Sequence, residues 1–185
     1  TFEGGTHNGK SPSLCFFEQS YLPLMQLMGM RCEVERIALG FYPAGGGKWK
    51  ITIEPTKDLG EVALTTAASN FAATPENCQL HALISQLPLS IGEREVKTAT
   101  DILNWDAAEG TVTEVDSPGP GNSFQLKIKS NTHTSVFEVV GEMGVSAERV
   151  AKRCAGRVRK FVHSQTAVEE QLADQLLIPM TLAGG

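Results

Sequence analysis

The chain has 185 residues, with 21 acidic and 16 basic side chains and a formal net charge of −5. Its content of 41% hydrophobic and 20% charged residues is that of an ordinary soluble globular protein, with length for one large domain or two small ones. The negative charge excludes a global basic field that would attract nucleic acid, so any contact with RNA or phosphate has to come from a local cluster.

The four cysteines lie far apart in the sequence and form no CxxC pair: Cys15, Cys32, Cys78 and Cys154. No histidine stands at metal-ligand spacing, so the pattern favours buried thiols in a reducing cytosol over a disulfide framework or a zinc site. No apolar stretch reaches the length of a membrane span, and no signal peptide is visible. We therefore expect a cytoplasmic protein without membrane contact, or a nuclear one if the source is eukaryotic.

The N-terminal part of the chain predicts a strand at TFEGGT and then a helix. Ser11 and Pro12 are typical of an N-cap and a first helical residue, because a proline loses nothing there by lacking an N–H. Apolar residues then recur at helical spacing as far as Gly29, which is expected to end the helix, and Pro23 is expected to kink it.

Two alternating segments follow, CEVERIAL and KWKITIEP, and the glycine-rich GFYPAGGG separates them. Alternation of apolar and polar residues is typical of strands, and we expect Cys32, Val34 and Ile37 to point inward. The pattern predicts a hairpin-like pair of strands.

From about residue 67 the pattern predicts a strand, a helix, three short strands and a second helix. These elements are expected at residues 77–87, 89–105, 109–115, 122–130, 134–142 and 146–164. The second helix has one apolar face, formed by Ala147, Val150, Cys154, Val158 and Phe161.

Two pairs of residues have the spacing of capping boxes, which mark helix starts. Ser90 and Glu93 are expected to begin the first helix of the middle segment. Thr166 and Glu169 are expected to begin a last helix, which should end shortly before Pro179.

Interspersed helices and strands with antiparallel neighbours predict an α+β protein. The change of pattern near residue 67 favours a small inserted domain of β-α-β-β-β-α type. We therefore expect residues 1–66 and 165–185 to form one incomplete core and residues 67–164 to form the insertion. The chain begins without Met and stops in an apolar segment, so we expect it to be a piece of a longer protein.

The segment GFYPAGGG at 40–47, placed between two strands, resembles the signature of the RNA 3′-terminal phosphate cyclases. Further stretches agree with that family in order and spacing: EGGTHN at 3–8, GPGN at 119–122, VVGEMGVSAERVA at 139–151 and LADQLLIPMTLA at 172–183. The resemblance covers nearly the whole chain, and the combination is specific although each piece alone is weak.

The resemblance implies a core of repeated βαβαββ units, similar to that of the enolpyruvate transferases, with a small inserted α+β domain. It implies a ligase of RNA processing that uses ATP, with Mg²⁺ or Mn²⁺, to convert an RNA 3′-phosphate into a 2′,3′-cyclic phosphate. The reaction would pass through AMP on an enzyme histidine and then through an RNA adenylate. By the same resemblance this histidine and the metal-binding segment lie outside the chain, so we expect no catalytic residue, no metal ligand and no activity from it alone.

By position, the resemblance implies that Pro12 and Phe16 hold the adenine ring and that Asp174 and Gln175 contact the ribose and the α-phosphate. Flat apolar contact suits a base, and carboxylate and amide groups suit hydroxyls and phosphate oxygens. The alternatives are a helix start for Pro12, a core position for Phe16 and a solvated helix face for the polar pair. Gln171 stands where the family has an aromatic residue expected to stack on adenine.

Further candidates for phosphate or RNA contacts are His7, Asn8 and Lys10 before the first helix, and Gly45, Gly46 and Gly47 in the glycine-rich turn. A helix N-terminus favours an anion, and glycine turns bring backbone N–H groups close to one. Alternatively, the glycines only let the chain bend between two strands. Leu39 occupies the place where the family usually has Arg or His, which removes one charged partner for a phosphate.

Basic residues crowd the helix expected at 146–164: Arg149, Lys152, Arg153, Arg157, Arg159 and Lys160. Such a cluster either contacts RNA phosphates or forms the solvated face of an amphipathic helix. The sequence alone favours the solvated face.

Three functions remain open at this point. The first is part of an RNA 3′-phosphate cyclase, with ATP and RNA ending in a 3′-phosphate as its ligands. The second is a cyclase-like protein that lacks the nucleophile and acts in ribosome assembly. The third is a stable fragment without function of its own, which ATP would not stabilise. Core surface left exposed by missing repeats would favour association, so a homodimer is a further expectation.

Overall fold

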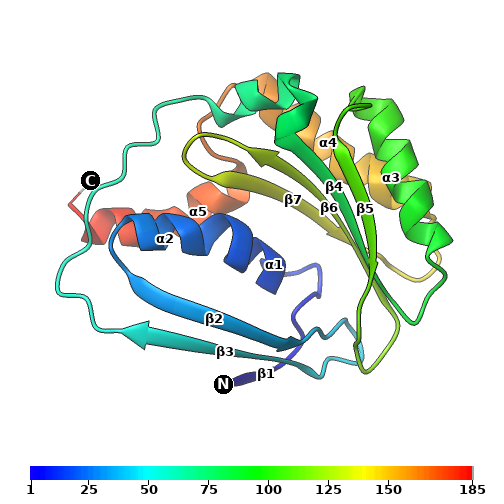
Figure 1. The fold of residues 1–185 in the computed structure, drawn as a ribbon, viewed down its shortest axis with the longest axis horizontal. Coiled ribbons are helices and arrows are strands. Elements are labelled where there is room, and N and C mark those ends of the chain that lie inside the picture. Colours follow the sequence, from blue (N-terminus) through cyan, green and yellow to red (C-terminus); the bar gives the residue numbers. More distant parts are fainter. Residues whose placement is uncertain (185) are drawn as a thin grey trace.

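The computed structural model describes residues 1–184, which form a three-stranded and a four-stranded sheet with helices packed against them (Figure 1). The elements are β1 Phe2–Gly4, α1 Leu14–Phe16, a π turn Phe17–Tyr21, α2 Leu22–Leu27, β2 Arg31–Ala38, β3 Gly47–Glu54, 3₁₀ turns Ala68–Ala73 and Pro75–Asn77, β4 Cys78–Ser85, α3 Ser90–Leu103, β5 Glu109–Glu114, β6 Gly121–Lys129, β7 Thr134–Val140, α4 Ala147–Ser164 and α5 Glu170–Leu182. The protein is therefore of α+β class, as the sequence predicts. No helix formed by these residues is both long and apolar enough to cross a membrane.

Strands β2 and β3 form the predicted hairpin, and β1 pairs antiparallel with the other edge of β3. Cys32 is buried and Val34 half-buried, as expected, but Ile37 is 52% exposed. The register of β2 shifts between Arg36 and Ala38, where a bulge adds one residue. Because successive side chains alternate between the faces of a sheet, Ile37 lies on the face opposite Cys32 and Val34, and its predicted inward orientation is wrong.

The N-terminal helix begins after Ser13 rather than at Ser11, because Ser13 Oγ accepts the Phe16 N–H at 3.1 Å. The Ser11 N–H instead donates to Asn8 Oδ1 at 3.1 Å, which folds the preceding loop into a turn. The prediction that Ser11 and Pro12 start the helix is therefore wrong by two residues, and Pro12 lies in the loop just before the cap.

Replacing Ser13 with Ala should lower the free energy of unfolding by about 1 kcal/mol, because the first turn of α1 loses its capping acceptor. Ser11→Ala removes only an exposed turn hydroxyl and should change the free energy of unfolding by less than about 0.5 kcal/mol. Urea unfolding followed by circular dichroism compares the two variants. Equal losses would contradict the assignment of Ser13 as the cap.

The helix is irregular where Pro23 enters it. Before the proline, residues 17–21 form a π turn in which the Leu22 N–H donates to the Phe17 carbonyl, and α2 then continues. A proline offers no N–H to the preceding turn, and a π turn shifts the pairing of the neighbouring groups. Gly29, with φ of 94°, follows the end of the helix as predicted.

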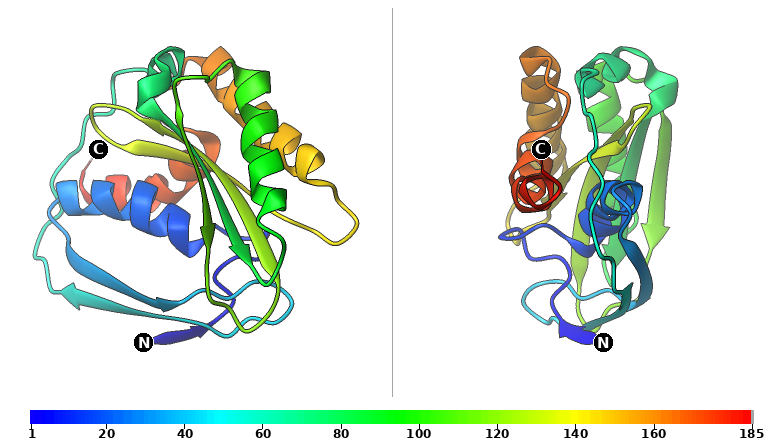
Figure 2. Two further views of the ribbon diagram at one scale, coloured as in Figure 1. Left: turned by 45° about the vertical axis from the view of Figure 1, so that its right-hand side comes forward. Right: turned by 90° about the vertical axis from the view of Figure 1, so that its left-hand side faces the viewer.

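The four-stranded sheet has the order β5-β4-β6-β7, and α3 and α4 lie side by side against one of its faces (Figure 2). Strand β4 pairs antiparallel with β6, and β6 with β7, but β4 and β5 are parallel. The expectation of antiparallel neighbours is therefore wrong for β4 and β5. The reason is that α3 connects them, and a helical crossover brings the chain back to the sheet in the same direction.

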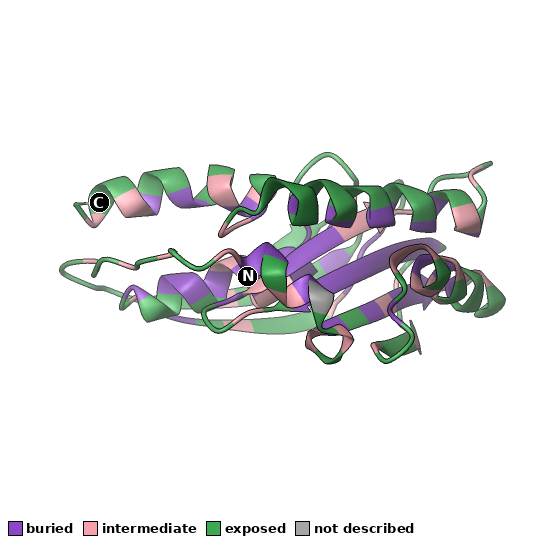
Figure 3. Cartoon of the chain, turned by 90° about the horizontal axis from the view of Figure 1, so that it is seen from above, coloured by how far each residue is buried: buried purple, intermediate pink, exposed green. Residues whose placement is uncertain are grey.

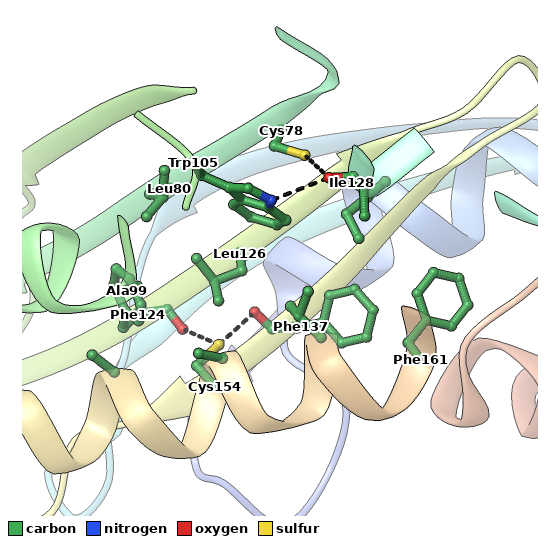
Figure 4. Packing of buried hydrophobic residues seen from close by; sticks show 14 of the residues in the cluster. Cys78, Leu80, Ala99, Trp105, Phe124, Leu126, Ile128, Phe137, Cys154 and Phe161 are labelled. Carbon is green, nitrogen blue, oxygen red and sulfur yellow. Dashed lines mark hydrogen bonds between the residues drawn. The ribbon is translucent and has the colours of Figure 1, made fainter. Parts of the chain in front are cut away.

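The largest core lies between this sheet and its two helices, and Figure 3 shows the buried strands beneath helices whose outer surfaces are exposed. Every residue of β6 from 121 to 128 is buried. Phe124 and Leu126 point toward α4, where Cys154 Sγ lies 3.2 Å from the Phe137 carbonyl oxygen (Figure 4). The predicted apolar face of α4 is buried along its whole length.

All four cysteines are buried free thiols, as the sequence predicts. Burial raises the pKa of Cys15 to about 11 and that of Cys78 to about 12, and it raises the pKa of Cys154 as well. Because the thiolate is the reactive form, these thiols are unreactive near neutral pH.

The predicted capping box at Ser90 and Glu93 is not formed. Ser90 is already helical in α3, with Leu89 at the N-cap and no side-chain hydrogen bond to the first turn. The Glu93 N–H bonds to the Leu89 carbonyl, so the main chain itself satisfies this donor.

Helix α5 begins at Glu170, later than the Thr166–Glu169 box predicts. The carboxylate of Glu169, which is 7% exposed, takes the N-cap role and accepts the Leu172 N–H at 2.5 Å. A buried carboxylate beside free N–H groups replaces the predicted threonine hydroxyl, so the box prediction is wrong for this helix too.

Helix α5 lies beside the α1–α2 helix (Figure 1). Their shared cluster also includes one β7 side chain and consists of Phe16, Leu24, Val136, Leu172 and Leu176. Helix α5 continues through Pro179 to Leu182, and the prediction of an end before Pro179 is wrong. Pro179 is itself buried, and tertiary packing of this kind overrides the intrinsic preference of proline. The packing places α5 next to the start of α1.

Two of the glycine-containing motifs pack directly on one another. A Cβ at Gly119 would lie 2.5 Å from Ala44 Cβ, and Gly121 faces the ring of Phe41. Only a residue without Cβ allows such close approach. The segments GFYPAGGG and GPGN, distant in sequence, therefore form one contact between the hairpin and the four-stranded sheet.

Candidate functional site

A cavity of about 640 Å³ lies where the loop before α1, the end of β7, α4 and α5 meet. Its lining residues are Asn8, Gly9, Lys10, Ser11, Pro12, Ser13, Glu138, Val139, Val140, Glu142, Arg153, Arg157, Gln171, Asp174 and Gln175. These segments come from both ends of the chain and from its middle. They meet because α5 packs beside the α1–α2 helix, as the right-hand view of Figure 2 shows.

The loop at 8–13 is organised around the side chain of Asn8. Asn8 Oδ1 accepts the N–H groups of Lys10 at 2.8 Å and of Ser11 at 3.1 Å. Gly9 between them has φ of 69°, a left-handed conformation that suits glycine. The resulting turn leaves Lys10 and Pro12 exposed at the cavity.

The wall formed by α5 consists of Gln171, Asp174 and Gln175, which share one helix face. Gln175 Nε2 donates to Asp174 Oδ2 at 3.0 Å, and both residues are exposed. Leu172 and Leu176 on the other side of the helix are buried. The polar stripe is solvated, as the alternative interpretation holds, and it also faces the cavity.

The structure brings together five of the residues predicted to contact nucleotide or phosphate: Asn8, Lys10, Pro12, Asp174 and Gln175. Phe16 does not line the cavity. It is 2% exposed and packs with Leu172 and Leu176, which corresponds to the core alternative.

His7 is 0% exposed and does not reach the cavity surface. Its Nδ1 lies 2.8 Å from Thr6 Oγ1, and its Nε2 lies 3.4 Å from Glu138 Oε1. Burial lowers the pKa of His7, although the Glu138 carboxylate acts in the opposite direction. The imidazole of His7 is therefore a buried neutral group beneath the loop, and it is not accessible to a phosphate in the cavity.

Gly45 and Gly46 lie in the turn between β2 and β3, Gly47 is the first residue of β3, and none of the three lines the cavity. Gly45 and Gly46 have φ of 66° and 71°, which only glycine adopts readily. A Cβ at Gly47 would lie 2.7 Å from Gly40 N and from Thr6 Cγ2. Backbone conformation and close packing thus account for all three glycines, in agreement with the alternative of a simple bend.

Glu138 in β7 lines the cavity, and the sequence did not mark it. Its carboxylate accepts hydrogen bonds from Gln125 Nε2 at 3.0 Å and from Ser123 Oγ. Ser123 and Gln125 are fully buried. The signal was the alternation in NSFQLKIKS, which puts Ser123, Gln125 and Lys127 on the face opposite the apolar side chains. A buried polar face of the sheet needs partners, and Glu138 is one of them.

Arg153 and Arg157 of α4 also line the cavity. Arg157 Nη1 donates to the Glu138 carbonyl at 2.7 Å, and Arg153 Nη1 donates to Glu142 Oε1 at 3.1 Å. Arg159 of the same helix donates instead to a main-chain carbonyl of α3. All six basic residues of α4 are exposed, as the solvated-face interpretation expects, and two of them also line the cavity.

A neighbouring cavity of about 770 Å³ lies between β7, the end of α4 and the start of α5. It shares Arg157, Gln171 and Asp174 with the first, and Phe137 and Phe161 contribute to its floor. The two cavities are therefore neighbours at the start of α5.

Within residues 1–184, no group of three or more His, Cys, Asp or Glu side chains is placed to hold a metal ion. The carboxylates nearest the cavity are already engaged with other groups: Glu138 with Gln125, Glu142 with Arg153, and Asp174 with Gln175. No chemistry is therefore assigned to a metal held by these side chains.

The family model for RNA 3′-terminal phosphate cyclase matches residues 1–185. The chain is 38% identical to the RNA 3′-terminal phosphate cyclase of Koribacter versatilis, covering 99% of this chain and 50% of that protein. It is 37% identical to that of Ectopseudomonas mendocina and 38% to that of Salmonella typhimurium, in each case over 98% of this chain and 52% of the relative. The chain thus spans about half the length of these curated relatives. Since the match runs from end to end, the chain belongs to the RNA 3′-terminal phosphate cyclase family.

Proposed function

We propose that this chain is part of an ATP-dependent RNA 3′-phosphate cyclase and supplies one wall of its nucleotide site. The observation that carries the proposal is that Asn8, Lys10, Pro12, Asp174 and Gln175 line a single cavity although they stand at opposite ends of the sequence. The resemblance implied nucleotide contacts for three of these five residues. A solvated helix face alone would not require Asp174 and Gln175 to lie at the same cavity as the N-terminal loop.

The chemistry of the lining suits an adenine nucleotide. Pro12 offers an exposed flat apolar surface to the base. Asp174 can accept hydrogen bonds from ribose hydroxyls, and the Gln175 amide can donate to a phosphate oxygen. Lys10 adds a flexible positive charge at the same cavity.

In this proposal the complete enzyme converts an RNA 3′-phosphate into a 2′,3′-cyclic phosphate through adenylylated intermediates. By the family resemblance, the nucleophilic histidine belongs to a segment outside these 185 residues. His7 is not that group, because it is buried beneath the loop. The divalent ion of the reaction would be held by groups other than the side chains described above.

We further propose that residues 67–164 are an insertion into a larger core of repeated βαβαββ units. The main core cluster supports this division, because all its buried members fall between Ala68 and Phe161. The remaining part leaves apolar side chains of α5 uncovered, with Leu177, Ile178 and Leu182 between 65% and 73% exposed. Such a face is suited to a further layer of the same core or to a second copy of the chain.

Asp174→Asn should weaken ATP binding by about tenfold, because the neutral amide is a poorer acceptor for ribose hydroxyls. The matched control is Asp58→Asn, in the exposed loop after β3, which should leave ATP affinity unchanged. Titration calorimetry measures both, and ATP should raise the melting temperature of the wild type by mass action. A wild type that ATP does not stabilise would contradict the proposal. Intact-protein mass after incubation with ATP should show no AMP adduct on this chain.

A further inference from the structure

Helix α4 presents two arginines to the cavity from the segment proposed as the insertion. Arg153 and Arg157 are four residues apart and therefore lie on the same helix face. They stand in the cavity lining together with the loop that carries Lys10. Nothing in the resemblance to the family pointed to either arginine.

Each guanidinium is held in place by one contact from the β7 region. Arg157 Nη1 donates to the Glu138 main-chain carbonyl at 2.7 Å, and Arg153 Nη1 donates to Glu142 Oε1 at 3.1 Å. A guanidinium has several N–H donors in a fixed fork, so one such bond positions the group and leaves further donors for a ligand. The fork matches the oxygens of a phosphoryl group, to which it can bind in a bidentate manner.

Three carboxylates line the cavity, Glu138, Glu142 and Asp174, and Asp174 is the one proposed above to meet the ribose. Glu138 directs its carboxylate to the buried side chains Ser123 and Gln125. Glu142 pairs with Arg153 at the surface, where their side chains are 65% and 40% exposed. An exposed pair of this kind contributes little free energy, so a phosphoryl group can replace Glu142 as the partner of Arg153 at small cost.

We propose that Arg153 and Arg157 form an anion-binding wall that holds phosphoryl oxygens in this cavity. The phosphoryl group belongs either to the polyphosphate chain of the nucleotide or to the 3′-phosphate of an RNA end. The inference rests on the proposed function and deepens it, because it makes helix α4 a direct contributor to substrate binding. Glu142 is then a competitor that the ligand displaces.

The test compares Arg157→Gln with Arg159→Gln in the whole 185-residue chain. Both arginines belong to α4 and donate to a main-chain carbonyl, but only Arg157 lines the cavity. Any loss of fold stability from a missing carbonyl contact should therefore be similar in the two variants. Arg157→Lys keeps the charge without the fork and should restore part of the affinity.

Dissociation constants are measured for ATP, adenosine, inorganic pyrophosphate, and a short oligoribonucleotide with a 3′-phosphate or a 3′-hydroxyl. Arg157→Gln should weaken binding of the phosphorylated ligand by about tenfold or more and leave adenosine and the 3′-hydroxyl RNA unchanged. A loss confined to ATP and pyrophosphate identifies the polyphosphate as the bound group, and a loss confined to 3′-phosphate RNA identifies the RNA end. Glu142→Gln should strengthen binding of the same ligand several-fold, because it frees Arg153.

The proposed anion-binding wall would be contradicted if Arg157→Gln and Arg159→Gln weakened binding equally. An equal loss of affinity for adenosine and ATP would contradict it too. A wild type that binds none of the phosphorylated ligands would overturn it as well. If the wild type binds neither adenosine nor ATP, but binds pyrophosphate or 3′-phosphate RNA in a way that depends on Arg157, the wall stands and the proposed nucleotide function fails. The two proposals can thus fail separately.

Discussion

Gly121→Ala should lower the free energy of unfolding by about 3 kcal/mol or more, the largest loss expected from a single added methyl group in this protein. A Cβ at this position would lie 2.5 Å from Phe41 Cβ and closer still to the ring. Phe41 is 0% exposed and cannot move outward, since it belongs to a cluster with Leu14 and Leu83. Gly121 cannot move either, because its backbone is paired with Ser85 in β4.

The matched control is Gly156→Ala in α4, where an added Cβ meets no atom within 4 Å. Alanine is a better helix former than glycine, so this variant should gain about 0.5–1 kcal/mol. Urea midpoints followed by tryptophan fluorescence measure both changes, because Trp49 packs against the cluster of Phe41 and Trp105 belongs to the core of the four-stranded sheet. A Gly121→Ala variant as stable as the wild type would show that the hairpin and the four-stranded sheet are not packed as described.

Glu95→Gln should raise the free energy of unfolding by about 3 kcal/mol at pH 8, the largest gain expected from one substitution. Glu95 is 0% exposed in α3, and burial raises its pKa from 4.5 to about 7, although the hydrogen bond from Asn122 Nδ2 at 2.7 Å acts in the opposite direction. Its Oε2 is buried without a hydrogen-bond partner among the described residues. A glutamine has nearly the same shape and carries no charge to desolvate.

The sign of the pH dependence follows from this raised pKa. Below pH 4.5 the carboxyl group is protonated in both folded and unfolded chains, so it causes no loss of stability. Between pH 4.5 and about 7 the folded chain keeps a proton that the unfolded chain releases, and stability falls by about 1.4 kcal/mol per pH unit. Above about pH 7 the loss stays constant.

Unfolding free energies of the wild type and of Glu95→Gln, measured from pH 4 to pH 9, should therefore diverge across this interval. The control is Glu93→Gln, an exposed position of the same helix, which should follow the wild type at every pH. Parallel curves for the wild type and Glu95→Gln would mean that Glu95 is solvated or paired in a way that the packing of α3 does not show.

The candidate site illustrates what motifs can and cannot predict. The resemblance singled out Pro12, Asp174 and Gln175, and the fold places all three at one cavity. The sequence shows Arg153 and Arg157 only as members of a basic helix face. That they line the cavity depends on which elements α4 packs against, and the residue types along the helix do not show this. Glu138 was not marked, because the alternation in NSFQLKIKS indicates a polar face that needs partners but does not identify the residue that supplies them.

The ends of the helices and strands are likewise predicted only in part by local sequence. Hydrophobic periodicity predicts nearly every helix and strand because it is a property of consecutive residues. The helix starts differ from prediction where a neighbouring side chain takes over a role, as Asn8 does for the Ser11 N–H and Glu169 does at α5. The continuation of α5 through the buried Pro179 likewise depends on packing against other elements.

By itself the sequence determined the kind and order of the elements, the buried state of the cysteines and, through its glycine motifs, the family. Each of these depends on residue type and spacing along the chain. Only the tertiary structure decided that GPGN packs on GFYPAGGG, that β4 and β5 run parallel, and that two arginines of α4 share a cavity with Lys10 and Asp174. These are contacts between distant segments, and their geometry follows from how whole elements pack, which no local pattern encodes.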